Sequence, residues 1–278
     1  MDIKDKILNN QVAVHCTTES EAIGFMRWCR QNEIKWTSGN ECSDDLSYWK
    51  TCGEETCYDV QQGRLSFFDI GWGDKQGFSI IPFSLVPVDK SVIVKVIKVN
   101  GTNRDIADRC RTTVGMELGT GEPSYAYMKK LYMSEHSPIR VKHFIVRIEN
   151  LPSWVATHLV RHKIGAEPFV RSQRTDRTGS NISRDELSQG ELVTMDMELN
   201  PQSCISISRK RLCGQASKET REVWRKVVEA IREVDKPLAE CCVPECIYRG
   251  FCTELKPCKY SETMLFNDSR NIYISKGE

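Results

Sequence analysis

The residues of this sequence best suited to chemistry are basic and lie in the segment 154–163. His158, Arg161 and His162 would share one face of a helix, because residues three and four positions apart lie side by side. The positions around them are mostly apolar, and a second basic set follows: Arg171, Arg174 and Arg177. Partly buried arginines need anionic partners, and phosphate matches their forked geometry. The pattern therefore predicts an anion-binding site, with a solvated basic helix face as the alternative.

A second group of candidate residues lies near position 211. Arg209, Lys210 and Arg211 are consecutive, so a helix would point their side chains in different directions. Arg211 and Gln215 are four residues apart and would share one face of that helix. This second pattern is weak by itself, because Arg and Gln are common on solvated helix faces.

Cysteines form the third group. The chain has 13 of them, and five crowd the stretch 241–258. Four thiolates suit tetrahedral Zn²⁺ or an iron–sulfur cluster. The predicted metal ligands are Cys242, Cys246, Cys252 and Cys258, with Cys213 or Cys241 as a substitute for one of them. Buried thiols that pack a short tail are the alternative.

Composition limits the classes of protein to consider. The 278 residues suffice for one large domain or two modest ones, at roughly 150 residues per domain. Thirty-nine basic and 38 acidic residues leave a net charge of +1, which argues against a broad nucleic-acid surface. No apolar run is long enough for a membrane helix, and the first residues do not form a signal peptide. We therefore expect a cytoplasmic protein without a disulfide framework.

The elements that must position these residues divide into three regions: 1–90, 91–240 and 241–278. Region 1–90 is expected to be a small α+β accessory module, ending in a linker at 82–90. Alternating and amphipathic patterns predict its helix at 20–30 and its strands at 12–16, 34–36, 56–60, 65–68 and 77–81. The module contains no constellation of catalytic residues.

Region 91–240 is expected to carry the chemistry, and region 241–278 is the cysteine-rich tail. The β-branched run 92–99 predicts a buried strand, and 143–148 a second strand. Asn150 near the cap and Pro152 in the first turn predict a helix over 152–163. Residues 167–200 show only weak periodicity. Further helices are expected at 105–111, 124–134, 201–211 and 217–234.

The order of these motifs resembles that of the flavin-dependent (alternative) thymidylate synthases. In that family His-Ser-Pro precedes a strand, a helix ends in Arg-His-Arg with a Ser a few residues on, and Asn-x-x-Ser comes eleven residues before an Arg. The matching residues here are His136-Ser137-Pro138, Arg161-His162-Lys163, Ser172 with Arg174, and Asn200 with Ser203 and Arg211. The resemblance covers residues 92–235 and implies an α+β fold, with a thymidylate synthase-like α/β domain after the small module.

The resemblance also implies an activity, the reductive methylation of dUMP to dTMP. It implies a homotetramer that binds FAD and dUMP between subunits, with methylenetetrahydrofolate and NADPH as co-substrates. Flavin contacts are implied for His136, Arg161, His162, Lys163, Asn200 and Gln215. Nucleotide contacts are implied for His158, Arg161, Ser172, Arg174, Arg184 and Arg211. Arg211 is the implied catalytic residue, which polarises the uracil ring. The family core needs no metal, so a zinc site in the tail would be structural.

Chemistry of this kind fits the residue types. Reduced flavin donates the hydride, while the protein contributes position and positive charge. The basic groups near residues 161 and 211 are therefore expected to converge, across a subunit boundary, on a flavin stacked over a pyrimidine.

Departures from the family pattern keep two alternatives open. Lys163 stands where the family has Arg, so a forked contact becomes a point charge. The segment between Arg174 and Asn200 is also shorter than in the family. These departures favour a related flavoenzyme that modifies another pyrimidine nucleotide. The other alternative is a non-catalytic protein that binds nucleotides or nucleic acid, and the near-neutral charge counts against it.

Overall fold

The computed structural model describes residues 2–43, 46–87, 91–178 and 184–275, without the side chains of Thr175 and Thr178. Its residues cluster into two compact units. The first unit comprises Met1–Lys90 and Arg174–Arg184, and the second comprises Ser91–Gln173 and Asp185–Glu278. Both units combine helices with a sheet, which is mixed in the first unit and antiparallel in the second, so the fold class is α+β, as predicted. The end of the predicted linker, residues 88–90, lies outside the described residues.

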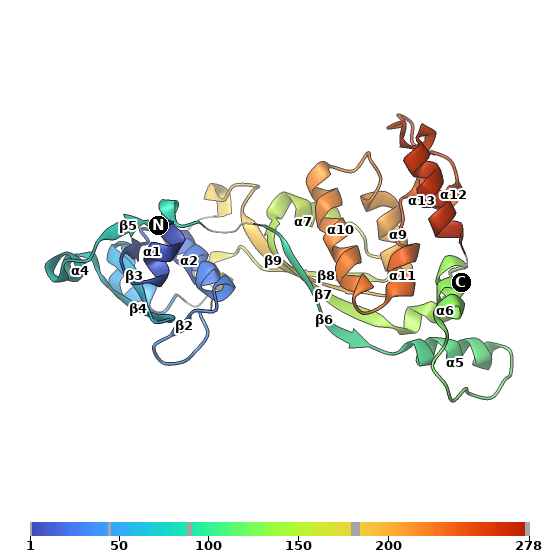
Figure 1. The fold of residues 1–278 in the computed structure, drawn as a ribbon, viewed down its shortest axis with the longest axis horizontal. Coiled ribbons are helices and arrows are strands. Elements are labelled where there is room, and N and C mark those ends of the chain that lie inside the picture. Colours follow the sequence, from blue (N-terminus) through green and yellow to red (C-terminus); the bar gives the residue numbers. More distant parts are fainter. Residues whose placement is uncertain (1, 44–45, 88–90, 179–183, 276–278) are drawn as a thin grey trace. The chain divides into compact units, whose positions relative to one another are not determined.

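The first unit is built on a five-stranded sheet with the order β2-β4-β3-β1-β5. Its strands are β1 (Ala13–His15), β2 (Lys35–Trp36), β3 (Thr56–Gln61), β4 (Arg64–Asp69) and β5 (Ile80–Pro82). Its helices within Met1–Lys90 are α1 (Ile3–Leu8), α2 (Glu19–Gln31), α3 (Trp49–Cys52) and α4 (Ile70–Gln76) (Figure 1). The five predicted strands and the helix at 20–30 are therefore confirmed in position, whereas α1 and α4 were not predicted.

The apolar face of α2 fills the core of the first unit. Phe25 and Trp28 stack with ring centroids 5.5 Å apart, and Phe25 also contacts Tyr58 of β3. Thr18 caps the helix by accepting a hydrogen bond from the Glu21 backbone N–H. A helix packed on a mixed sheet in this way buries enough aromatic surface to order a module of this size.

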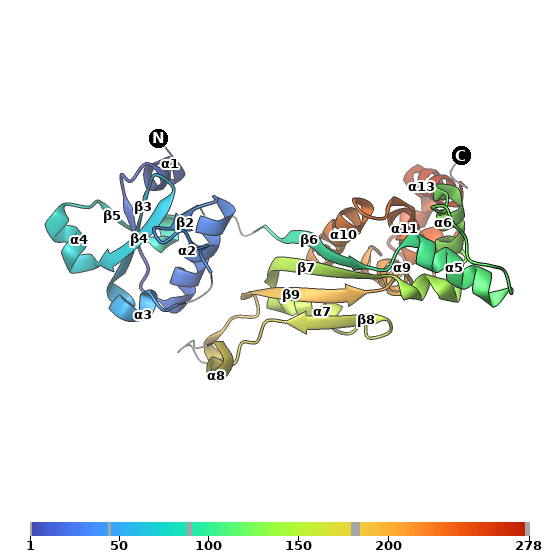
Figure 2. The ribbon, with the colours of Figure 1, turned by 90° about the horizontal axis from the view of Figure 1, so that it is seen from below.

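The second unit is built on a four-stranded antiparallel sheet with the order β6-β7-β9-β8. Its strands are β6 (Ile93–Asn100), β7 (His143–Pro152), β8 (Ala166–Val170) and β9 (Leu192–Leu199). Helices α7, α9, α10 and α11 lie together on one face of this sheet, and the view from below shows the strands in front of them (Figures 1 and 2).

Strand β9 is central to this sheet and was missed. Its side chains alternate between buried and half-buried positions, with Val193, Met195, Met197 and Leu199 facing the core. The alternation is visible in the sequence. It was overlooked because charged and hydroxyl residues occupy every other position and make the segment look polar.

Strand β6 is an edge strand, which corrects the prediction of a buried one. Ile97 and Val99 are 47% and 37% exposed, and in the described residues β6 pairs only with β7. Lys95 and Lys98 interrupt the β-branched run, as is common where an edge must resist pairing with another chain.

The predicted helix over 152–163 is shorter than expected. Strand β7 continues to Pro152, whose partner is Leu192, and α7 covers only Ser153–Leu159. Asn150 is not a cap but the site of a register shift in β7, with φ 56°. Pro152 fits the last position of the strand because the pairing with β6 has already ended at Glu149. Arg161 and His162 therefore lie beyond the helix, and the prediction that they share a helical face with His158 is wrong.

The remaining helices agree in position with those predicted for region 91–240. They are α5 (Asn103–Thr113), α6 (Tyr125–Met133), α9 (Pro201–Arg211) and α10 (Lys218–Arg232). Three further helices were not predicted: α11 (Lys236–Cys241), α12 (Glu245–Arg249) and α13 (Met264–Ile274). The buried face of α10 includes Val223, Trp224, Val227 and Ile231, which join the main core. The Trp224 indole donates a hydrogen bond to the Ser208 hydroxyl at 2.9 Å and so fixes α10 against α9.

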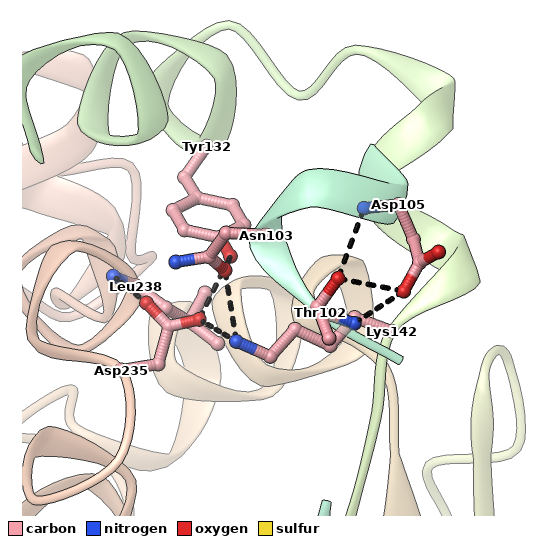
Figure 3. A network of polar contacts seen from close by, with 7 residues as sticks. All are labelled: Thr102, Asn103, Asp105, Tyr132, Lys142, Asp235 and Leu238. Carbon is pink, nitrogen blue, oxygen red and sulfur yellow. Dashed lines mark hydrogen bonds and ion pairs between the residues drawn. The ribbon is translucent and has the colours of Figure 1, made fainter. Parts of the chain in front are cut away.

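A buried polar network ties α5, α6, β7 and α11 together (Figure 3). Lys142 Nζ lies 2.7 Å from Asp235 Oδ2 and 2.8 Å from Asn103 Oδ1. The Tyr132 hydroxyl donates to the same Asp235 oxygen at 2.8 Å, and the Leu238 backbone N–H donates to Oδ1 at 3.1 Å. Burial and the Asp235 carboxylate raise the pKa of Tyr132 far above its usual range. Each charge in this network has its partners.

No helix in the described part of the chain is both long and apolar enough to span a membrane.

Candidate functional site

Arg211 joins the two groups of basic residues identified in the sequence. It is the last residue of α9, and its Nε donates a hydrogen bond to His162 Nε2 at 2.8 Å. Its Nη2 donates to the His158 carbonyl oxygen at 2.7 Å. Residues 49 and 53 positions apart in the sequence therefore meet at the ends of α7 and α9. The contact forms within one chain, which corrects the expectation that the two groups meet across a subunit boundary.

The hydrogen bond from Arg211 defines the state of His162. A guanidinium N–H can only donate, so His162 Nε2 must accept, and the ring is neutral with its proton on Nδ1. Burial and the neighbouring Arg211 charge lower the pKa of His162 to about 4. Both observations indicate a neutral imidazole at pH 7 that can still donate one hydrogen bond through Nδ1.

His158 is held from the other side by α10. Its Nδ1 lies 2.9 Å from the Thr220 hydroxyl, which accepts a hydrogen bond from the Ser217 hydroxyl at 2.7 Å. Ser217 also caps α10. The indole of Trp154 contacts the His158 ring edge-on, at 5.6 Å between centroids. These contacts fix the part of the chain whose carbonyl receives Arg211.

The cluster is rich in positive charge and poor in negative charge. Burial and the charge of Arg161 lower the pKa of Arg211. Arg161 and Lys163 are exposed in the turn after α7, and neither forms an ion pair with any of the described residues. Arg211 is bonded only to neutral acceptors. An arrangement of this kind can bind an anion, because no carboxylate of the chain already neutralises it.

The three consecutive basic residues of α9 point in different directions, as predicted. Arg209 pairs with Glu135 and stacks over the Tyr248 ring, with 3.6 Å from its guanidinium carbon to the ring centroid. Lys210 is exposed. Only Arg211 turns toward the end of α7, so it is the one member of the three that belongs to the site.

Asn200 caps α9 next to the same turn. Its Oδ1 accepts a hydrogen bond from the Ser203 backbone N–H at 2.9 Å. Gly165, with φ +68°, lies directly against it, and a Cβ at position 165 would come within 2.5 Å of Asn200 Nδ2. Glycine is therefore required for the chain to pass from α7 into β8 at this point. Asn200 therefore lies beside the cluster, but its side-chain oxygen is already used to cap α9.

Two other predicted flavin contacts have different surroundings. His136 is exposed at the start of a short 3₁₀ turn, Ser137–Val141, and makes no side-chain cap there. Gln215 lies beyond α9, so it does not share a helix face with Arg211, which corrects that prediction. Its Nε2 instead donates to the Lys256 carbonyl oxygen in the tail at 2.6 Å. Their contacts with a flavin stay predictions.

The predicted nucleotide-phosphate residues are divided between the two units. Ser172 is exposed just after β8 in the second unit. Arg174 and Arg184 belong to the first unit, at the starts of the segments α8 (Thr175–Thr178) and Arg184–Glu186. Arg174 is paired in a forked contact with Asp176, at 2.9 and 2.6 Å. Their part in phosphate binding therefore stays a prediction.

The four tail cysteines predicted as metal ligands lie in different surroundings. Cys242 is buried in the main core and hydrogen-bonded to Ser208, and burial raises its pKa to about 12. Cys246, Cys252 and Cys258 line one cavity with Cys213, which follows α9. No three Cys, His, Asp or Glu side chains in the described ranges are already arranged to hold a metal ion.

Sequence reasoning missed the residues that hold His158 and Asn200 in position. Thr220 and Ser217 hold His158 in place through hydrogen bonds, and the glycine at position 165 leaves room for the side chain of Asn200. The glycine could have been found, because a lone Gly between a helix and a strand often marks a positive φ.

Comparisons with known proteins give only distant similarities. No protein-family model matches the sequence, and no curated protein sequence matches it. Solved structures similar to it include a thymidylate synthase X (ThyX) from Helicobacter pylori with FAD and dUMP. That structure is 14% identical with a TM-score of 0.46, over 55% of this chain and 99% of that one.

Two further structures are similar to the same degree. A UMP/dUMP methylase, PolB from Streptomyces cacaoi, bound with 5-Br dUMP, is 12% identical with a TM-score of 0.45, over 58% of this chain and 96% of that one. Another flavin-dependent ThyX structure from Helicobacter pylori, complexed with FAD and dUMP, is 15% identical with a TM-score of 0.45, over 54% and 99%. At these identities and TM-scores, none of the three assigns a function to this chain.

Proposed function

We propose that the second unit is the catalytic part of a flavin-dependent thymidylate synthase. It would methylate dUMP to dTMP, with methylenetetrahydrofolate as the one-carbon donor, FAD as the cofactor and NADPH as the reductant. The proposal includes a homotetramer that completes its sites between subunits. Its support is the order of the motifs in the sequence together with the contacts among the residues of those motifs.

One observation carries the proposal: Arg211 is bonded to both His158 and His162. These residues belong to two separate motifs of the resemblance, and the contact would not be expected if the two motifs had matched by chance. A guanidinium held by a neutral ring and a carbonyl keeps its full charge for a ligand. That is the property needed to stabilise negative charge on a pyrimidine ring.

The residues of the cluster fit an anionic cofactor. Arg161 and Lys163 are exposed cations without ion-pair partners among the described residues, and Arg211 is half-buried beside them. The diphosphate of FAD and the phosphate of dUMP would each supply the missing negative charge. Arg161 and Lys163 would hold the cofactor, and its flavin ring, when bound, supplies the hydride of the reduction.

The remaining residues would act by position. His158 and Thr220 hold the carbonyl that receives Arg211, so the guanidinium approaches the pyrimidine from a fixed direction. His162 would offer its Nδ1 proton as a hydrogen-bond donor without adding a second charge. Arg211 would stabilise the negative charge that develops on the ring as its C5 carbon becomes nucleophilic.

The test is to purify the full chain, record its absorbance spectrum and assay it with dUMP, methylenetetrahydrofolate and NADPH. We expect flavin bands in the spectrum and dTMP as the product. Arg211→Ala should reduce kcat/KM for dUMP by at least about 10²-fold, as the loss of one preorganised charge typically does.

Lys210→Ala is the matched control, because Lys210 is exposed, adjacent in sequence and directed away from the cluster. It should leave turnover and bound flavin unchanged. If Arg211→Ala turned over dUMP normally, its catalytic role would be wrong. If bound, reducible flavin produced no dTMP from dUMP, the acceptor would be wrong.

A second candidate is a flavoenzyme that modifies a different pyrimidine nucleotide. It is favoured by the pairing of Arg174 with Asp176, which satisfies a guanidinium that the resemblance assigns to the phosphate of dUMP. Assaying the same preparation with a panel of uridine and cytidine nucleotides distinguishes the two candidates. A product formed from another nucleotide, with none from dUMP, would select this one.

A further inference from the structure

Four thiols from three separate segments face one cavity of the second unit. Cys213 follows α9, Cys246 lies on α12, and Cys252 and Cys258 lie in the loop 250–259 between α12 and the turn at Tyr260–Glu262. All four line a cavity of about 760 Å³, which Cys242, at the end of α11, also lines. The cluster therefore joins residues 45 positions apart in the sequence.

Three contacts hold the loop against the residues that follow α9. Gly214 lies so near Cys258 that a Cβ at position 214 would come within 2.9 Å of its Sγ. Gln215 Nε2 donates to the Lys256 carbonyl oxygen at 2.6 Å. The Cys213 thiol donates to Glu254 at 3.8 Å. The approach of the loop to Cys213 thus depends on several independent contacts.

The loop has almost nothing apolar to hold it in place. Between Gly250 and Lys259 no residue is buried, Phe251 is 59% exposed and Leu255 is fully exposed. The nearest apolar cluster has only three buried members, Ile247, Phe266 and Tyr273, and none of them lies in the loop. A metal ion bound by the thiols of such a loop would supply ordering free energy that the loop does not obtain from a hydrophobic core.

We propose that Cys213, Cys246, Cys252 and Cys258 form a structural four-thiolate site for Zn²⁺. Four protein thiolates around one ion are the arrangement of closed structural zinc sites. The half-buried Cys252 and the exposed Cys258 would move inward to reach the ion, because the thiols are not yet arranged around one point. Each thiol gives up its proton on binding, and each zinc–sulfur bond forms without any change of oxidation state.

Zinc, rather than an iron–sulfur cluster, suits the exposed position of this site. Zn²⁺ has no redox chemistry, so solvent access to Cys252 and Cys258 has no effect on its valence. Binding of the ion would supply free energy that orders the loop, which is the role of a structural metal ion. Cys242, the fourth ligand expected from the sequence, is replaced by Cys213 because its thiol is buried in the core beside Ser208.

The test measures metal in the full chain, expressed with both zinc and iron available and purified without a metal-affinity tag. We expect about one zinc per chain, as for a single closed site. Cys252→Ser with Cys258→Ser should reduce zinc to background. Cys110→Ser, on α5, is the matched control and should retain the ion, because Cys110 is a half-buried thiol that does not line the cavity.

Two further measurements keep the result independent of folding defects. Co²⁺ exchanged into the wild-type chain should give the sulfur-to-metal charge-transfer and tetrahedral bands of a four-thiolate site. Removal of the metal by a chelator should expose the loop to trypsin at Lys256 and Lys259, while returned zinc should protect it.

Several outcomes would overturn the proposal. Equal zinc in the wild type and the double variant would place the ion elsewhere. Iron with acid-labile sulfide would make the site a cluster rather than a zinc centre. A metal-free chain whose loop resists trypsin equally with and without added zinc would show that these thiols bind no structural ion.

Discussion

Two cation clusters in the second unit are built in opposite ways. Lys142 lies in the core and contacts the Asp235 carboxylate, which also accepts bonds from Tyr132 and the α11 backbone. Arg211 lies half-buried at the end of α9 and contacts only a neutral ring and a carbonyl. The first cluster neutralises its own charge, and the second does not.

The Lys142 cluster therefore uses its charge to stabilise the fold, whereas the Arg211 cluster keeps its charge available for binding an anion. A buried ion pair is costly to break, because removal of one partner leaves the other charge in a poorly hydrated environment. A half-buried guanidinium without a carboxylate remains attractive to any anion that reaches it. If this distinction holds, removing a partner of Lys142 should destabilise the fold, whereas changes around Arg211 should alter its local structure and its binding of an anion.

The largest effect is expected for Asp235→Ala. It removes the carboxylate facing Lys142 and the cap of α11 together, and should lower the free energy of unfolding by about 3–5 kcal/mol. Urea denaturation of the full chain measures the change. Asp105→Ala is the matched control, since Asp105 is an exposed carboxylate in the capping box of α5 (Figure 3) and should cost only about 1 kcal/mol. Equal losses in the two variants would contradict a special role for the buried pair.

A smaller loss of stability is expected for Gly165→Ala, which tests the turn between α7 and β8 next to the Arg211 cluster. The positive φ and the approach to Asn200 make any side chain costly, so stability should fall by about 1–3 kcal/mol. Gly190→Ala is the control, because its nearest neighbour would lie 3.7 Å away, and it should change stability by less than about 0.5 kcal/mol. A neutral Gly165→Ala would mean that the turn adapts freely.

The sequence predicted the parts of this molecule that depend on local pattern. The amphipathic run of α2 and the capped helix Pro201–Arg211 were correctly placed, because periodicity and caps are readable over short distances. The motif order also selected Arg211 and His162, which do meet. Their roles toward a flavin and a nucleotide stay predictions.

The parts that failed depend on partners far away in the sequence. Pairing with β9 keeps Pro152 in a strand, so the helix begins later and ends before Arg161. The burial of Cys242 depends on how α11 packs against α9, because its thiol lies in the core beside Ser208. Neither the strand partner of Pro152 nor the core position of Cys242 can be read from neighbouring residues.

His162 should remain neutral over the physiological pH range. Its pKa of about 4 can be measured by NMR, and Arg211→Gln should raise that pKa while Lys210→Gln leaves it unchanged. The unfolded state binds the proton at the ordinary value of 6.5. This group therefore makes stability fall as pH drops from about 6.5 to about 4, and contributes no pH dependence above that window. A protonated His162 at pH 7 would contradict the bond from Arg211.

The smallest effect concerns Arg174, a cation that already has a carboxylate but lies at the surface. Arg174 and Asp176 are 54% and 58% exposed, so Arg174→Ala should change stability by less than about 1 kcal/mol. If Arg174 binds the phosphate of dUMP, Asp176→Asn removes a competing carboxylate from its guanidinium and should tighten dUMP binding by up to about fivefold, the equivalent of that same 1 kcal/mol. Arg174→Ala should weaken binding instead.

Calorimetric titration of dUMP into both variants gives the two affinities. Unchanged affinity in both would remove Arg174 from the nucleotide site and make its pairing with Asp176 purely structural, like that of Lys142 with Asp235.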